Sequence, residues 1–361
     1  MLTLFLEYCI IRLWKDLTNQ CWWTIGGEPF GVFPFFIVRG FMKEFTTYEE
    51  QINILKSRNL IIDDEVEFEE ILKDTGYYNL INGYSSFFKD EDDIYIRNTS
   101  SDNIKSLYDF DKKLRDIVYK YAMLIESRFK SLVSYTFSKY HGENHLKYLM
   151  RENFDKDPAK EEKIAKLINE CYDIIKACSN KESKKYRQCI GHYVTNYGFV
   201  PLWVLIRAMT FGDVSIFYAN MTLPEKTEIA KEYGLKPSQL EIMIKMLVSF
   251  RNAVAHDERI FCKRLYQSSL PTKLKVYDYL QVPRNDHNVP IVGRNDFYSL
   301  IIIFKYLLKP LQFADFWCEF ILSGTKQIDQ VNPVIKQRLL KEMGFWKNWK
   351  GIKNFKNLEN N

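Results

Sequence analysis

Apolar residues recur every three or four positions along most of this chain, the spacing that one face of an amphipathic α-helix produces. The longest such pattern covers residues 103–139 without a proline or glycine and predicts one long helix. Another covers residues 238–264, where Leu240, Ile244 and Leu247 begin a predicted buried stripe. Alternating strand patterns are few, so we expect an all-α protein.

Local signals place several helix ends. Thr46 or Thr47 is expected to cap the first helix after residue 42, with acidic residues in its first turn. Pro201 is expected to begin a helix that Phe211-Gly212-Asp213 ends, because glycine often terminates helices. Ser238 is a candidate cap for the helix over 238–264.

The same patterns divide the chain into four parts. Residues 1–41 lack helical periodicity after a short apolar stretch that is too charged to span a membrane, and we expect them to be an upstream extension outside the fold. Residues 42–100 predict an N-terminal helical module. Residues 101–313 predict a helical bundle with a polar insertion near 151–186, and residues 314–361 a helical C-terminal extension.

Composition narrows the function only slightly. The net charge of +5 permits a local basic patch for nucleic acid without requiring one. The 23 tyrosines and 26 phenylalanines can stack on bases or fill a helical core, and for Trp346 and Trp349 we expect packing on the body. Seven cysteines without a C-x-x-C pair indicate free thiols in a reducing cytoplasm. No metal-binding pattern stands out, and we expect neither a metal nor a cofactor.

The segment RNAVAHDER contains the clearest candidate chemistry, Arg251-Asn252 followed by His256. A guanidinium suits a phosphate, and an imidazole transfers protons near neutral pH. RNA carries its own nucleophile, the 2′-hydroxyl, so this pair suits cleavage of RNA without a metal, and DNA would not be cut in this way. On a helix the two side chains lie roughly 140° apart, flanking a groove. The alternative is a solvated cation and a histidine favoured at a helix C-terminus.

Several blocks around this motif occur in the order of a known family. The blocks are Thr75-Gly-Tyr-Tyr-Asn-Leu-Ile-Asn-Gly-Tyr84, Asp109-Phe-Asp-Lys-Lys-Leu-Arg115, Gly191-His-Tyr193, Val200-Pro-Leu-Trp203 with Phe211-Gly212, Arg251-Asn252-x-x-x-His256, and Met343-Gly-Phe-Trp346. They resemble the Abi family of bacterial abortive-infection proteins, of the AbiD and AbiF type, and the RN-x-x-x-H segment resembles that of HEPN ribonucleases and RNA-binding proteins. The sequence departs from the pattern at Asp257, Arg207 and Cys262, where histidine, an acidic residue and asparagine are usual.

The resemblance implies a HEPN-like bundle, a homodimer with one motif from each chain, and a cytoplasmic protein that acts on RNA, including a cognate small RNA. His256 would act as acid or base, Arg251 would stabilise the phosphate, and Asn252 would hold the turn. Glu126 would orient Arg251 or hold the dimer. Further candidates for RNA binding, from the resemblance or from basic character near the motif, are Arg128, His192, Tyr193, Lys245, Arg259, Lys263 and Arg264.

Three functions remain open from the sequence. The first is a metal-independent endoribonuclease of phage defence, and the second is an RNA-binding protein that holds a structured small RNA without cutting it. The third is a purely structural interaction protein. Substitution of His256 separates them, because only the first loses cleavage and only the first two interact with RNA.

Overall fold

The computed structural model describes residues 45–325 and 333–356, and the expected extension over residues 1–41 lies outside the described residues. In the part that is described, the chain forms helices and turns, with isolated β-bridges and no strand. The expectation of an all-α fold is confirmed.

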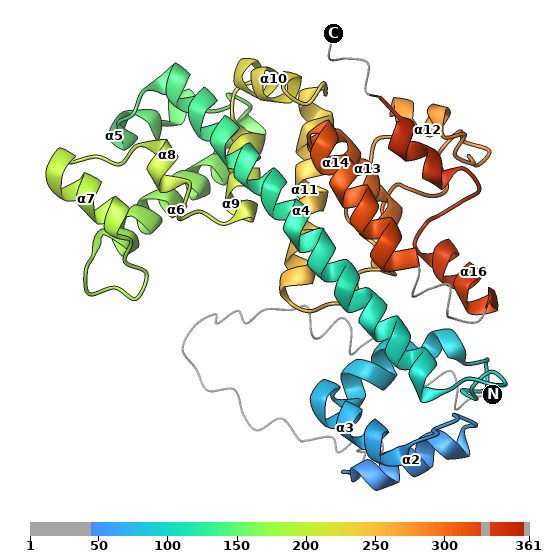
Figure 1. Cartoon of the computed structure of the whole chain (residues 1–361). Coiled ribbons are helices and arrows are strands. Elements are labelled where there is room, and N and C mark those ends of the chain that lie inside the picture. Colours follow the sequence, from blue (N-terminus) through green and yellow to red (C-terminus); the bar gives the residue numbers. More distant parts are fainter. Residues whose placement is uncertain (1–44, 326–332, 357–361) are drawn as a thin grey trace, which may run out of the picture. The chain divides into compact units, whose positions relative to one another are not determined.

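The helices follow one another along the chain, with longer irregular segments between α11 and α12 and between α12 and α13 (Figure 1). The N-terminal elements are α2 (Tyr48–Ser57), α3 (Glu65–Thr75), the π-helix η1 (Tyr78–Asn82) and the 3-10 helix η2 (Ser85–Phe88). The central elements are α4 (Ser101–His141), α5 (His145–Tyr148), η3 (Arg151–Asn153), η4 (Pro158–Lys160), α6 (Glu161–Ser179), α7 (Gln188–Tyr197), α8 (Leu202–Leu205), α9 (Phe211–Asn220), α10 (Leu223–Lys231) and α11 (Pro237–Ala255). The C-terminal elements are α12 (Lys275–Tyr279), α13 (Phe297–Leu307), α14 (Pro310–Glu319), η5 (Phe320–Thr325), α16 (Pro333–Glu342) and η6 (Trp349–Asn354).

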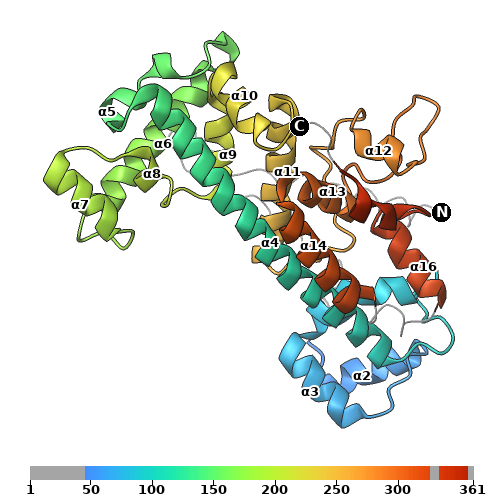
Figure 2. The same ribbon diagram turned by 45° about the horizontal axis from the view of Figure 1, so that its top comes forward.

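Helix α4 contacts N-terminal, central and C-terminal elements of the fold. Its 41 residues confirm the predicted long helix, and at 1.5 Å per residue they extend for about 60 Å. Ser100 and Asn103 form a capping box at its start, and Gly142 with a φ of +77° ends it. It packs against η1 near its start, α11, α13 and α14 along its length, and α8, α9 and α10 further on (Figures 1 and 2).

The N-terminal module joins α4 through a series of contacts in which each element packs against the next one along the chain. Thr47 caps α2, as expected, because its Oγ1 accepts from the backbone N–H of Glu50 while the Glu50 carboxylate accepts from the N–H of Thr47. Helix α2 packs against α3, α3 against η1, and η1 against α4. The tyrosine-rich block therefore lies directly on the long helix.

Helix α11 is enclosed by other helices over most of its surface. It packs against α4, α9, α10 and α13. The predicted stripe is buried, with Leu240, Ile244 and Leu247 fully covered. The predicted extent to residue 264 is wrong, because the helix ends at Ala255 and Asp257 has a φ of +57°, in the left-handed region. Its cap is Lys236, since Pro237 occupies the first helical position and Ser238 lies inside the helix.

The chain between α8 and α9 also differs from the prediction. Helix α8 ends at Leu205, and Phe211-Gly212-Asp213 begins α9 where we expected it to end a helix. Thr210 caps α9, because its Oγ1 accepts from the N–H of Asp213 at 3.1 Å and the Asp213 carboxylate accepts from the N–H of Thr210 at 2.8 Å. The capping box, rather than the glycine, sets the boundary here.

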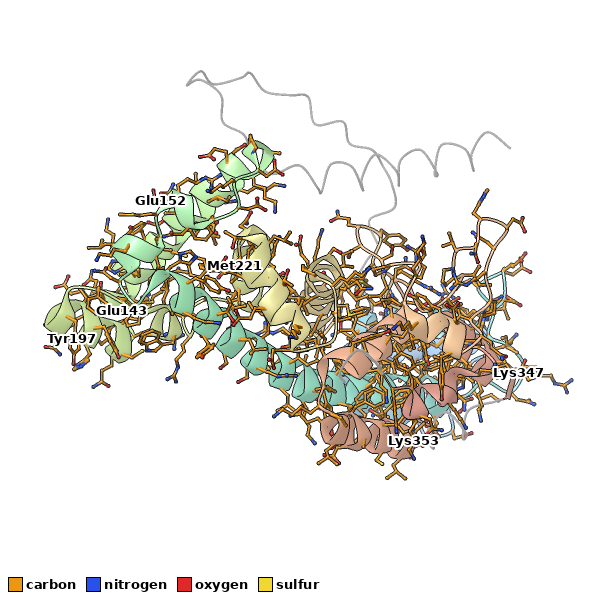
Figure 3. The ribbon with its side chains drawn as sticks, turned by 90° about the horizontal axis from the view of Figure 1, so that it is seen from above. Glu143, Glu152, Tyr197, Met221, Lys347 and Lys353 are labelled. Carbon is orange, nitrogen blue, oxygen red and sulfur yellow. The ribbon has the colours of Figure 1, made fainter. Side chains whose placement is uncertain are left out.

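The polar segment near residues 151–186 contributes an apolar face to the fold. Ile164, Leu167 and Cys171 of α6 are buried, and α6 packs against α7, α8 and α9. Figure 3 shows Glu143, Glu152 and Tyr197 together on one side of the view and Lys347 and Lys353 on the opposite side.

The C-terminal elements close the same hydrophobic core. Helix α13 is buried almost all round, as expected, and Trp349 is buried while the indole of Trp346 donates to the carbonyl of Leu280 at 3.2 Å. Gly344 has a φ of +82°, and a Cβ there would lie 2.3 Å from the Asp296 carboxyl carbon. Only glycine therefore fits at this position of the Met343-Gly-Phe-Trp346 block. Among the described helices, none has both the length and the apolar character that crossing a membrane requires.

Candidate functional site

The residues of the RN-x-x-x-H segment lie on the last turns of α11, where the helix leaves the core. Arg251 is half-buried, Asn252 is exposed, and His256 is the exposed residue at the C-cap. The imidazole of His256 has no hydrogen-bond partner among the described residues, so both ring nitrogens are accessible.

Arg251 is positioned by a buried carboxylate of α4. Its Nε lies 3.4 Å from Oε2 of Glu126, and neither atom has a hydrogen-bond partner in the described part of the chain. The other Glu126 oxygen binds the ammonium of Lys130 at 2.8 Å, and Lys130 also donates to the carbonyl of Met209 at 2.8 Å. This ion pair is the contact that we expect if Glu126 orients Arg251.

The guanidinium of Arg251 also reaches the exposed face of its own helix. Its Nη1 donates to Oδ1 of Asn252 at 3.3 Å. Positions 245, 249, 252 and 256 lie within about 60° of one another around the helix, so Asn252 is on the same exposed stripe as His256. The bond to Asn252 therefore turns the fork toward the side of the helix where His256 lies, which offsets part of their angular separation.

A buried polar network fixes the turn that follows His256. Oδ2 of Asp111 accepts from the Tyr84 hydroxyl at 2.8 Å and from Nη1 of Arg115 at 2.5 Å. Its Oδ1 accepts from the backbone N–H groups of Ile260 and Phe261, each at 3.1 Å. Nη2 of Arg115 lies 3.0 Å from the carboxylate of Asp257, the residue after His256. The network therefore connects α4 and the tyrosine-rich block to the chain after α11.

The protonation of this network follows from its donors. Burial raises the pKa of Asp111, and the Arg115 guanidinium, the two backbone N–H groups and the Tyr84 hydroxyl oppose that rise. Every group that contacts the carboxylate is a donor, so the ionised form is the one that the site accommodates. Burial also raises the pKa of Tyr84, which keeps its hydroxyl protonated and able to donate.

Two of the predicted RNA-binding cations contact other parts of the fold. Nη2 of Arg128 donates to the carbonyl of Glu232 at 3.2 Å, and its guanidinium lies over the Tyr233 ring. Arg264 lies 3.3 Å from the buried Asp296 carboxylate and donates to the carbonyl of Glu342 at 3.0 Å. These contacts give both side chains a structural role.

The remaining candidates fall into two places. Arg259 donates to the carbonyl of Gly83, and Lys263 pairs with Glu258 at 2.7 Å, and both line a cavity beside the tyrosine-rich block. Lys245 is exposed on α11, and its ammonium has no partner among the described residues. His192 and Tyr193 are on α7, which packs against α6 and α8 and lies apart from α11 in both views (Figures 1 and 2). The structure does not bring these two residues to the end of α11.

Two cavities flank the pair of Arg115 and Asp257, which lines both. The first, of about 450 Å³, lies between the tyrosine-rich block and the chain after α11. The second, of about 420 Å³, lies between α4 and the end of α11 and is lined by Tyr119 and Lys120. Arg251 and His256 line neither of them. Motif reasoning missed Asn79 and Asn82 of the first cavity, although they belong to the block TGYYNLINGY, which was the available signal.

The fold and this site define an all-helical protein with an arginine and a histidine at the exposed end of a buried helix. A family model described as Abi-like protein matches residues 70–262, and the chain belongs to this family. The match includes Asp111, Arg115, Arg251 and His256, and the family supports a role in abortive infection, a form of phage defence. No curated protein and no solved structure matches the chain significantly.

Replacing Asp111 with alanine is expected to lower the free energy of unfolding by about 3 to 5 kcal/mol, because the change leaves buried donors and part of the Arg115 charge unpaired. Urea unfolding followed by circular dichroism measures this loss. Asp109→Ala is the matched control on the same helix, since the half-buried Asp109 pairs with Lys105 where solvent still reaches both side chains, and it should cost less than about 1 kcal/mol. Equal losses for the two variants would contradict the role given to the network.

Proposed function

We propose that this Abi-like protein acts in phage defence as a metal-independent endoribonuclease of the HEPN type. The observation that carries the proposal is the pairing, on one helix end, of an oriented guanidinium with an accessible imidazole. The buried carboxylate of Glu126 and the exposed amide of Asn252 hold Arg251. The ring of His256 faces solvent without a partner among the described residues. A phosphodiester at this helix end would meet a fixed cation and a group that transfers protons.

The reaction needs no external nucleophile. The 2′-oxygen of a ribose attacks the adjacent phosphorus, its bond to phosphorus forms, and the bond from phosphorus to the 5′-oxygen of the next nucleotide breaks. One proton leaves the 2′-hydroxyl and one is added to the departing 5′-oxygen, and His256 serves in one of these transfers. Arg251 stabilises the negative charge that grows on the phosphate oxygens. The products are a 2′,3′-cyclic phosphate and a 5′-hydroxyl.

A single motif supplies one imidazole, while the reaction requires a base and an acid. A homodimer with two facing copies of α11 supplies both, and it places two guanidinium groups near one phosphate. The exposed stripe of α11 that carries Lys245, Asn252 and His256 is the surface that would face the partner copy and the RNA.

His256→Ala is expected to reduce cleavage of RNA by about 10²- to 10⁴-fold, since it removes the proton-transferring group. Arg251→Lys should reduce cleavage by about 10²-fold, because it keeps a charge opposite Glu126 and loses the fork that binds a phosphate. The measurement is the rate of cutting of a labelled RNA with chelator present, together with analysis of the new ends for 2′,3′-cyclic phosphate.

The matched controls are His287→Ala and Arg97→Ala, which change exposed side chains of the same types elsewhere on the surface. They should cut at the parent rate. Cutting by His256→Ala at the parent rate would refute the proposed role of the imidazole.

Mixing the parent chain with His256→Ala tests the composite site. If each cut needs His256 of both chains, a heterodimer of the two proteins should be as weak as the His256→Ala dimer. In an equal mixture, random exchange leaves about a quarter of the dimers with both imidazoles, so cutting should fall from about half to about a quarter of the rate of the undiluted parent protein. The assay measures cutting before and after the two proteins are unfolded and refolded together. Cutting that stays at about half, in a mixture shown to contain heterodimers, would rule out a site that needs both imidazoles.

Two observations favour a second function. The charge of Arg251 is already opposed by that of Glu126, and neither cavity is lined by Arg251 or His256. Such a site suits a protein that holds a structured small RNA without cutting it. Sequencing the RNA that co-purifies with the parent and with His256→Ala distinguishes the two. Intact RNA in both favours holding, and cut ends in the parent alone favour cleavage.

A further inference from the structure

The cavity between the tyrosine-rich block and the chain after α11 combines three kinds of group. Its lining includes the aromatic rings of Tyr78 and Tyr108, the amides of Asn79 and Asn82, and the cations of Arg259 and Lys263, among others. Aromatic faces stack on nucleobases, amides match the paired donors and acceptors of base edges, and cations bind phosphate. Such a combination is typical of sites for one unstacked nucleotide.

Tyr108 packs against Tyr84, whereas the ring of Tyr78 and the two amides are not used by the fold. Tyr78 is 76% exposed, and the side chains of Asn79 and Asn82 are exposed and have no hydrogen-bond partner among the described residues. Asn79, Asn82 and Tyr78 all belong to η1, a π-helix turn. Distortions of this kind occur frequently at functional sites, because they re-aim side chains that a regular helix would direct elsewhere. These groups are therefore available to a ligand.

The two acidic residues of the lining already pair with cations of the protein, so they do not call for a cationic ligand. The Asp257 carboxylate pairs with Arg115 at 3.0 Å, and the Glu258 carboxylate pairs with Lys263 at 2.7 Å. Arg259 keeps a positive charge that no carboxylate compensates among the described residues, since its guanidinium binds the carbonyl of Gly83 and lies 6.0 Å from the centre of the Tyr84 ring. Arg115 faces both Asp111 and Asp257, so charges of the two signs balance around the cavity, and Arg259 is the cation that is left to bind a phosphate.

We propose that this cavity binds one nucleotide unit, with a base against Tyr78 and the two asparagine amides and a phosphate near Arg259. The unit is a nucleotide of the RNA strand, and this part of the inference rests on the proposed function. Asp257 lines the cavity and follows His256 directly in the chain, so the bound nucleotide is close to the link that His256 would act on. The cavity fixes the register of the strand at the cutting site.

The test uses the full chain carrying His256→Ala, so that RNA is not consumed. The probe is a fluorescein-labelled single-stranded RNA of mixed sequence, titrated by anisotropy, with 5′-AMP and 5′-UMP as free-nucleotide competitors. In that background Tyr78→Ala, and separately the double variant Asn79→Ala with Asn82→Ala, should weaken RNA binding about tenfold. Tyr135→Ala is the matched control, a tyrosine on α4 that is 68% exposed, and it should bind like the background protein.

Each result decides something. Loss in both cavity variants with competition by the mononucleotides only at far higher concentration assigns the cavity to the RNA strand. Binding of mononucleotides that depends on Tyr78, without binding of RNA, assigns it to a free nucleotide. Equal RNA binding by all variants, or no binding of either probe, overturns the site. Cutting of RNA by the parent protein is scored separately, so failure of the cavity leaves the nuclease proposal intact and failure of cutting leaves the cavity intact.

Discussion

The carboxylate of Asp111 is the interaction on which the arrangement of this protein depends. It lies fully buried on the long helix α4 and accepts from four donors that belong to the tyrosine-rich block, to α4 itself and to the chain after α11. A buried charge is tolerated only when it is paired and hydrogen-bonded, so these three parts of the chain are obliged to meet. Because Arg115 extends the network to Asp257, the turn that begins at His256 is held in place from outside its own helix.

This constraint explains how the family blocks relate to one another. Tyr84, Asp111 and Arg115 bind one another and set the position of the chain that follows α11. Glu126 does the same for Arg251 from a position further along α4. One rigid helix thus positions the arginine through one carboxylate and the histidine through another. Residues that are far apart in sequence are required together, and the proposed chemistry is left to the half-buried Arg251 and the exposed His256.

The sequence predicted the parts of the fold that depend on local pattern. The long helix, the buried stripe of α11, the Thr47 cap and the buried α13 follow from periodicity and capping, which are properties of neighbouring residues. The end of α11 and the start of α9 were mispredicted. The first is set by the distant Asp111, and the second by a capping box in which glycine is only a helical residue. Arg251 and His256 were named as candidates from the motif and stay a prediction. The cavity beside the turn after His256 was not predicted, because its lining comes from segments that only tertiary contacts bring together.

We propose that the end of α11 acts on one ribose-phosphate link through the 2′-hydroxyl of the RNA. The sharpest test is a labelled RNA with a single 2′-deoxynucleotide at a mapped cutting position, since the substitution removes the nucleophile and leaves the phosphate. Cutting at that link should disappear, while cutting at other links and the affinity for the RNA should be unchanged. Continued cutting at the substituted link would show that the 2′-hydroxyl is not the nucleophile.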